Sequence, residues 1–363
     1  MKYYLILIFL YFFSNQSLAQ SNRTLFEVAS EKVKAENYNG AIADLNTFIK
    51  SNPKHLPSRI LRAKCYSFEN KFQLALEDNL IILDLDKDAN TEAKTRYLRD
   101  IGFDYSMIDE YAKSREFYQK ANTLKGNDIY ILSNIGYTFR KDKLYDSAIV
   151  YFDKALLLDK THIFSIRNKI QCLKALDKID EAFNLSNEFL ISKNYDIDIS
   201  LFRASILKDR GKTTEALNDY HRALTYEPED YDALIGVSEC YIALGYYEED
   251  LKLKQRMVKV FKANKESNTM LSNANYLLAS AYKFLGDYQS AIETFDEAEA
   301  LNPKDAGILL ERALAKALSK DLEGACNDLK KARAIDEEKA NEYEEFIIED
   351  SEFEEFANYC FPN

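Results

Sequence analysis

The sequence predicts an all-α protein built from stacked helical hairpins, and three observations lead to this prediction. The first is a pattern that repeats every 34 residues along most of the 363-residue chain. The second is the recurrence of small residues at two fixed places in each repeat. The third is the composition, since 10 Gly and 5 Pro leave little of the chain for strands with tight turns or for disordered linkers. Repeats of this length are typical of solenoids, in which each unit packs on its neighbours.

The frame of the repeat is set by the segment from Ile129 to His162, which reads as two short helices joined by a polar turn. Moving this template in steps of 34 residues places nine repeats, with short polar insertions at 90–94 and 265–271. Both insertions fall between units, where a solenoid tolerates extra residues. The second of them predicts a bend near residues 262–272. The repeats are 22–55, 56–89, 95–128, 129–162, 163–196, 197–230, 231–264, 272–305 and 306–339.

Small residues recur where two helices of a hairpin must cross. Position 20 of the repeat is alanine in seven of nine units, as at Ala148, and position 8 is small in eight of nine, as at Gly136. Packed helices approach to about 8–10 Å, and the close end of that range requires small side chains at the crossing. The seventh repeat departs from the pattern, because Asp250 replaces the alanine and Lys254 the large residue at position 24.

The two ends of the chain differ in character from the repeats. Residues 1–19 combine Lys2, an apolar run over 3–13 and small residues up to Ala19, which predicts a cleaved secretory signal or, as the alternative, a retained anchor. The run is too short to span a bilayer. At the other end, 338–357 reads as one amphipathic helix, and 340–363 is expected to form an acidic C-terminal cap. We therefore expect an exported protein, periplasmic or secreted, without an integral membrane span in the mature chain.

Charge and motif content exclude several function classes. The net charge of -12 disfavours nucleic acid and anionic lipid as partners, because phosphate contacts need clustered Lys and Arg. The three His lie far apart along the repeats, and the sequence has no Gly-rich phosphate loop, nucleophile elbow or zinc-protease motif. The sequence therefore predicts a protein that is not an enzyme and has no cofactor or metal.

The five cysteines divide into two groups. Cys65, Cys172 and Cys240 all occupy position 10 of their repeats, where a free thiol packs as a small hydrophobe. Cys326 lies on the second helix of the last repeat and Cys360 follows the cap helix. In an oxidising compartment these two either form a disulfide that pins the cap or remain two unpaired thiols.

A period of 34 residues with small residues at fixed places resembles the tetratricopeptide (TPR) repeat. The resemblance implies a right-handed α-solenoid of about nine TPR-type hairpins with a C-terminal capping helix. It also implies a protein-binding scaffold, in which positions 2, 5, 9, 12 and 13 of the first helices line a concave groove. In repeats three to five these positions hold six bases and several aromatics without an acid, and Asn134 matches a position of the TPR carboxylate clamp. The implied groove residues are Arg96, Arg99, Phe103, Tyr130, Asn134, Tyr137, Arg140, Lys141, Phe164, Arg167, Gln171 and Lys174.

Such a surface suits an acidic or carboxylate-bearing protein segment, because Arg offers forked donors and aromatic rings offer stacking area. The function hypothesis is a non-enzymatic scaffold or adaptor that binds an extended segment of another protein in this groove. One alternative is a structural component of a cell-envelope assembly, engaged through its convex face or its ends. Another is a solvated face of mixed charge without a specific ligand.

Overall fold

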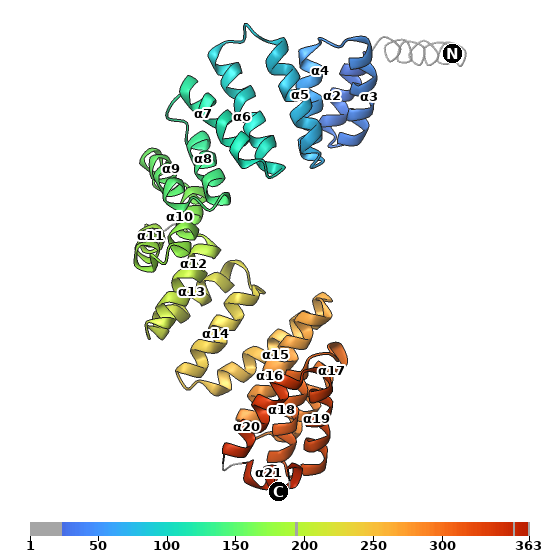
Figure 1. The fold of residues 1–363 in the computed structure, drawn as a ribbon, viewed down its shortest axis with the longest axis vertical. Helices are drawn as coiled ribbons and strands as arrows, with labels where there is room; N and C mark the ends of the chain where they lie inside the picture. The colour runs from blue at the N-terminus through green and yellow to red at the C-terminus, as the bar shows by residue number, and fades with distance from the viewer. Residues whose placement is uncertain (1–23, 193–194, 351–352, 362–363) are drawn as a thin grey trace, which may run out of the picture. The chain divides into compact units, whose positions relative to one another are not determined.

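The structure is a computed structural model that describes residues 24–192, 195–350 and 353–361. The described residues form 20 helices and the fold is all-α, with consecutive helices packed as hairpins in a TPR-like solenoid, which confirms the predicted fold class (Figure 1). The chain divides into two compact units, Met1–Asn194 and Tyr195–Asn363. The predicted signal at 1–19 lies outside the described residues.

The first unit contains five hairpins, α2·α3 to α10·α11. Helices α4, α8 and α10 begin at Leu56, Ile129 and Ile163, the residues that start the second, fourth and fifth repeats of the sequence frame. The helices are α2 Leu25–Lys34, α3 Tyr38–Ser51, α4 Leu56–Phe68, α5 Phe72–Leu85, α6 Thr91–Met107, α7 Tyr111–Leu124, α8 Ile129–Lys141, α9 Tyr145–Leu158, α10 Ile163–Ala175 and α11 Ile179–Ile191.

The second unit contains four hairpins, α12·α13 to α18·α19, followed by two further helices. Its helices are α12 Ile197–Asp209, α13 Thr213–Tyr226, α14 Tyr231–Ala243, α15 Tyr247–Asn264, α16 Asn268–Phe284, α17 Tyr288–Leu301, α18 Ala306–Leu318, α19 Leu322–Ile335, α20 Glu337–Glu349 and α21 Glu354–Cys360.

All nine hairpins turn through a residue in the left-handed conformation at position 15 of the repeat. In the fourth hairpin this residue is Lys143, at φ 60°, and the N–H of the next residue, Leu144, donates to the carbonyl of Phe139 at 2.9 Å. This bond closes the first helix as a Schellman motif. The sequence frame did not reveal the turn, because only three of the nine residues are glycine, the type that such a conformation favours. The nine are Glu36, Asn70, Asp109, Lys143, Asp177, Gly211, Gly245, Gly286 and Lys320.

The small residues lie at the helix crossings, as the sequence predicts. Ala148, Ala182 and Ala216 are all fully buried. A Cβ added at Gly136 would lie 2.7 Å from the ring of Phe152, which faces it from the second helix of the same hairpin. The absence of a side chain at Gly136 therefore sets how closely α8 and α9 approach.

The two insertions are built largely into helices, which corrects the prediction that they lie between units. Residues 91–94 form the first turn of α6, and 268–271 the first turn of α16. Only Lys265 to Ser267 connect α15 to α16. Extra residues that continue a helix satisfy their own backbone hydrogen bonds, which an irregular link would leave to water. The bend near 262–272 stays a prediction.

Buried ion pairs recur within hairpins at a spacing of 16 residues, and their arginines also reach back 16 residues to the preceding hairpin. In the last repeat Arg312 Nε donates to Asp328 Oδ2 at 2.8 Å, and Arg312 Nη1 to Asp296 of the preceding repeat at 2.5 Å. Arg62 makes the equivalent bonds to Asp78 and Asn46, each at 2.7 Å. Burial alone would raise the pKa of Asp328, but hydrogen bonds from Arg312 and Lys316 lower it.

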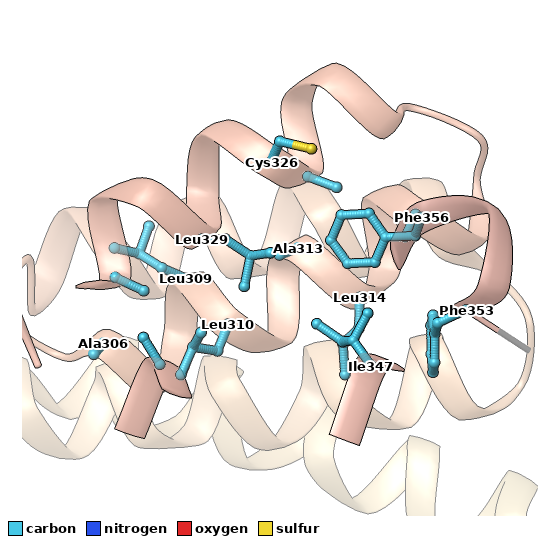
Figure 2. Packing of buried hydrophobic residues seen from close by; sticks show 14 residues of the cluster. Ala306, Leu309, Leu310, Ala313, Leu314, Cys326, Leu329, Ile347, Phe353 and Phe356 are labelled. Carbon is cyan, nitrogen blue, oxygen red and sulfur yellow. The ribbon is translucent and has the colours of Figure 1, made fainter. Parts of the chain in front are cut away.

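The C-terminal cap covers the last hairpin with two helices, α20 and α21, whereas the sequence predicted one helix over 338–357. In one continuous helix Ile347 and Phe356 would face about 180° apart, because each residue turns by about 100°. The break between the helices lets both side chains enter one cluster with Leu310 and Leu314 of α18 (Figure 2). Phe346, the neighbour of Ile347 on α20, is 46% exposed.

Candidate functional site

Ten predicted binding residues lie on the first helices of the third to fifth hairpins, and we call them the basic surface. None of the ten is buried, so all can meet a ligand. They are Arg96, Arg99 and Phe103 on α6, Asn134, Tyr137, Arg140 and Lys141 on α8, and Arg167, Gln171 and Lys174 on α10.

A hollow of about 270 Å³ between α6 and α8 joins three residues of the basic surface, namely Arg99, Phe103 and Asn134. Its walls include Tyr130, which is 63% exposed, and the ring of Tyr118, which is buried. The amide nitrogen of Asn134 is already engaged, since it donates to the carbonyl of Tyr130 at 2.7 Å. Arg99, the carboxylate of Asp100 and the side-chain oxygen of Asn134 are thus the polar groups that can meet a ligand here.

A larger hollow of about 540 Å³ lies between α4 and α6 and adjoins the first, because Arg99 and Phe103 line both. It also contains Arg96 of the basic surface. Its other wall comes from the second repeat, through Lys64 and Phe68 of α4. This wall lies outside repeats three to five, from which the basic surface was predicted.

Two carboxylates, Asp100 and Asp104, also line the larger hollow, at positions that the TPR resemblance does not assign to the ligand. Asp100 accepts from Arg99 Nη2 at 3.2 Å, and Asp104 accepts from Asn79 Nδ2 at 2.7 Å. They occupy positions 6 and 10 of the repeat, one residue beyond the positions that the TPR resemblance assigns to the ligand. Two acids four residues apart share a helix face, and this spacing was the available signal.

Burial raises the pKa of both carboxylates. Burial raises the pKa of Asp104 to about 7, although the hydrogen bond from Asn79 lowers it, because the side chain is 1% exposed. Burial also raises the pKa of Asp100, and the neighbouring Arg99 opposes that shift. Near neutral pH, then, Asp104 carries only part of its negative charge.

A second group of basic-surface residues gathers around the ring of Tyr137 on α8. The guanidinium of Arg140 lies 5.2 Å from the ring centroid and the ammonium of Lys141 lies 5.9 Å from it. Phe164 of α10 approaches the same ring at 5.9 Å between centroids. Among the described residues, Nε of Arg140 is buried without a hydrogen-bond partner. This arrangement offers two neighbouring aromatic rings and an unused donor side by side.

The remaining basic-surface residues, Arg167, Gln171 and Lys174, lie on α10. They do not line either hollow. The structure thus divides the basic surface into the two hollows around Arg99, the cluster around Tyr137 and an open face on α10.

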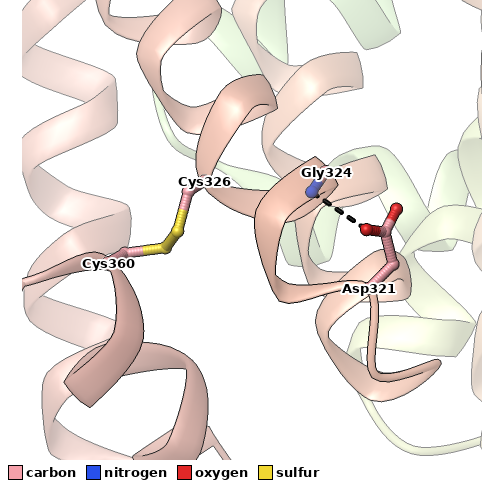
Figure 3. The surroundings of a disulfide bond; sticks show 4 residues. All are labelled: Asp321, Gly324, Cys326 and Cys360. Atoms are coloured by element: carbon pink, nitrogen blue, oxygen red, sulfur yellow. Dashed lines mark hydrogen bonds between the residues drawn. A yellow bond between two sulfur atoms is a disulfide. The ribbon is translucent and has the colours of Figure 1, made fainter.

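Cys326 of α19 and Cys360 at the end of α21 form a disulfide, with 5.6 Å between their Cα atoms (Figure 3). The sequence left this pair open between a disulfide and two thiols, and the structure has the disulfide. Cys65, Cys172 and Cys240 are free and buried, as predicted. Burial raises the pKa of the Cys172 thiol to about 11, so this group remains protonated at neutral pH.

Within the part of the chain that the structure describes, no three His, Cys, Asp or Glu side chains are grouped so as to hold a metal ion. The described helices also include none with the length and apolar character needed to cross a membrane.

Comparison with family models finds two matches, each described as tetratricopeptide repeat. One covers residues 178–331 and the other 129–162, so together they span just over half of the chain. None of the curated proteins compared with the chain matches it.

Comparison with solved structures finds matches at low sequence identity. A tetratricopeptide repeat protein from Parabacteroides merdae is 16% identical over 73% of this chain and 98% of its own, with a TM-score of 0.47. The C-terminal part of a TPR repeat-containing protein from Cytophaga hutchinsonii is 17% identical over 79% of this chain and 98% of its own, with a TM-score of 0.46. PilW, described as a widely conserved type IV pilus biogenesis factor, is 17% identical over 58% of this chain and 94% of its own, with a TM-score of 0.47.

Proposed function

Because the chain belongs to the tetratricopeptide repeat family, whose members mediate protein–protein interactions and are typically not enzymes, we propose that it is a non-enzymatic scaffold that holds an extended, acidic segment of a partner protein on the basic surface. The observation that carries the proposal is the gathering of six accessible bases on α6, α8 and α10, in a chain whose net charge is -12. A preformed surface of this kind loses little entropy on binding.

Exposed aromatic rings on the same three helices as the basic surface add contact area to it. Tyr130, Phe103 and Phe164 are 63%, 41% and 39% exposed, respectively. Rings of this kind supply stacking and apolar contact, while Arg supplies forked donors to carboxylates. The two hollows at Arg99 are each large enough to receive a side chain of the bound segment, and Asp100 and Asp104 would favour a polar or cationic side chain there.

The unused donor on Arg140 supports the proposal that a partner protein supplies a hydrogen-bond acceptor here. Its Nε is buried and has no hydrogen-bond partner among the described residues. A buried donor left unpaired costs about 1–3 kcal/mol, which a carboxylate or carbonyl of the partner would recover.

The alternative, a part of a cell-envelope assembly engaged through the second helices, has one observation in its favour. Val150 and Leu157 on α9 are 50% and 81% exposed, and their spacing of seven residues puts them on one helix face. Export to an oxidising compartment belongs to both proposals and is supported by the Cys326–Cys360 disulfide. Cell fractionation, with sequencing of the mature N-terminus, tests it.

The test of the scaffold proposal is charge reversal on the basic surface. The probe is a fluorescent peptide of alternating Glu and Tyr, compared with one of alternating Lys and Tyr. We expect the Glu peptide to bind the full chain with an affinity that falls as salt increases, and Arg99→Glu, Arg140→Glu and Arg167→Glu together to abolish that binding.

A matched control carries the same change in net charge at Lys113→Glu, Lys120→Glu and Lys154→Glu, which are exposed on the second helices α7 and α9. This variant should bind the Glu peptide as the parent does. If both triple variants lose the same affinity for the Glu peptide, the effect comes from net charge alone and the proposal is refuted. Binding that survives the Arg reversal and disappears in Val150→Ser/Leu157→Ser would favour the alternative.

A further inference from the structure

A small hollow in the second unit lies between α14, α15 and α16, far along the chain from the basic surface. Its volume is about 190 Å³, and its apolar walls are Ile242, Tyr247, Ala281 and Phe284. Sites for drug-sized molecules are larger, at about 300–1,000 Å³. The hollow can therefore take a single side chain.

Asp250 and Lys254 are the charged residues that line this hollow. It also contains Ser280, whose hydroxyl donates to the carbonyl of Tyr276 at 2.9 Å. Asp250 and Lys254 are 3% and 5% exposed, and Lys254 Nζ lies 2.7 Å from Asp250 Oδ2. Ser238 Oγ donates to the other carboxylate oxygen at 2.6 Å. The two departures of the seventh repeat from the sequence pattern are thus one buried ion pair.

In the fourth and eighth repeats the equivalent positions contain apolar pairs. They are Ala148 with Phe152 in the fourth repeat and Ala291 with Phe295 in the eighth, all fully buried. Replacing such a pair by two charges is not favoured by stability alone, because desolvation of the charges offsets their attraction. The ion pair therefore calls for a role other than packing.

The ammonium of Lys254 has N–H donors that the described residues leave unpaired. It carries three N–H groups, of which one is satisfied by Asp250, and the described residues supply no other acceptor to it. Buried polar groups are normally hydrogen-bonded, so a ligand in the hollow gains by presenting an acceptor to Lys254.

Asp250 limits which acceptor fits. Because it already balances the charge of Lys254, an entering carboxylate would meet a carboxylate at close range. A hydroxyl can form hydrogen bonds with both side chains, because it accepts from Lys254 and donates to Asp250. An aliphatic side chain or a phenylalanine ring would fill the volume and leave the Lys254 donors unpaired.

We propose that this hollow is a binding site for a tyrosine side chain of a partner protein, held by apolar walls around the ring and by the Asp250–Lys254 pair at the phenol oxygen. The rim argues for a protein rather than a free phenol: Phe284 and Ile242 are 65% and 45% exposed, and a single ring would leave much of them uncovered. The site is independent of the basic surface, which lies in the other unit.

The experiment compares capped amino acids on the full chain by ligand-observed NMR titration. N-acetyltyrosinamide should bind saturably, and N-acetylphenylalaninamide about tenfold more weakly, because it lacks one hydrogen-bonding group. N-acetyl-4-carboxyphenylalaninamide should bind no better than the phenylalanine probe. Equal binding of the tyrosine and phenylalanine probes, or no binding of the tyrosine probe, would overturn the proposal. Binding of p-cresol without binding of the tyrosine probe would overturn the assignment to a protein side chain.

Two variants locate the site. Asp250→Ala/Lys254→Leu restores the Ala and Leu found at Ala41 and Leu45 of the first repeat, so it should fold and lose the preference for tyrosine over phenylalanine. Phe284→Ala removes an exposed ring from the wall of the hollow. It should weaken the binding of both probes by the same factor without affecting folding. Retention of the full tyrosine preference in the double variant, or unchanged affinities in Phe284→Ala, would refute the site.

The triple Arg reversal on the basic surface separates this site from the proposed function. It should leave binding of the tyrosine probe unchanged, whatever its effect on the Glu peptide. Loss of tyrosine binding in that variant would place the probe on the basic surface and overturn the inference.

Discussion

The pKa of Asp104 shows how strongly the protonation of one side chain depends on its surroundings in the folded protein. Asp104 lies on α6 at the bottom of the hollow between α4 and α6, where its one hydrogen bond from a neighbouring side chain comes from the neutral amide of Asn79. Burial without a cationic partner raises its pKa to about 7. The folded protein therefore holds a proton here that the unfolded chain releases near pH 4.

This proton makes stability depend on pH in a defined direction. Between pH 4 and 7 the folded state binds more protons at Asp104 than the unfolded state does, so stability falls as pH rises through that window and levels off above it. Asp104→Asn removes this dependence while keeping an acceptor for Asn79. At pH 8 it should be more stable than the parent by on the order of 1–3 kcal/mol, and at pH 4 about equal. Urea unfolding across pH 4–8 measures both.

Asp84→Asn, at an exposed carboxylate on α5, is the control and should leave the pH profile unchanged. If Asp104→Asn is no more stable than the parent at pH 8, Asp104 is fully ionised without cost in the folded state and this account of the hollow fails.

At the scale of the element, each hairpin is defined by its crossing and its turn. The crossing of α8 and α9 places Gly136 against the ring of Phe152, with no room for a Cβ. The turn at Lys143 then reverses the chain through a left-handed residue. Because the crossing and the turn each depend on a few neighbouring residues, a single substitution can test the contribution of either one to stability.

Gly136→Ala should destabilise the protein by about 1–3 kcal/mol, because the added methyl group overlaps a fully buried ring and either α8 or Phe152 must shift. Chemical denaturation of the full chain measures the change. Gly126→Ala is the matched control: the nearest atom to its added Cβ is 3.8 Å away, so its effect should stay within about 0.5 kcal/mol. Equal stability of Gly136→Ala and the parent would mean that the crossing is looser than the structure shows.

At the scale of the whole molecule, a stack of repeats must close its last apolar layer. Here α20 and α21 cover α18 and α19, and the Cys326–Cys360 disulfide ties the end of α21 back to α19 (Figures 2 and 3). In repeat proteins stability is the sum of units and their nearest-neighbour interfaces. Loss of the disulfide should therefore act locally.

Cys360→Ser should lower the stability of the C-terminal hairpin by about 2–4 kcal/mol, because the bond closes a loop of 34 residues in the unfolded chain. Hydrogen exchange should show faster exchange in α18 to α21 and unchanged protection in α4 to α9. Dithiothreitol should reproduce this pattern in the parent and do nothing further to the variant. A uniform increase in exchange across both units, or an equal effect of the reductant on the variant, would contradict a local role.

The sequence by itself determined the hairpin architecture, the packed position of the free cysteines and the residues of the basic surface, because small, large and basic residues recur at fixed places within each repeat. Only the tertiary structure decided which side chains meet across repeats. It placed Asp104 with Lys64 and Phe68 of the preceding repeat, and joined Cys326 to Cys360. It also broke the cap into two helices. The reason is that periodicity reports which face of its own helix a residue occupies, whereas hollows, ion pairs and end closure depend on neighbours that only stacking brings together.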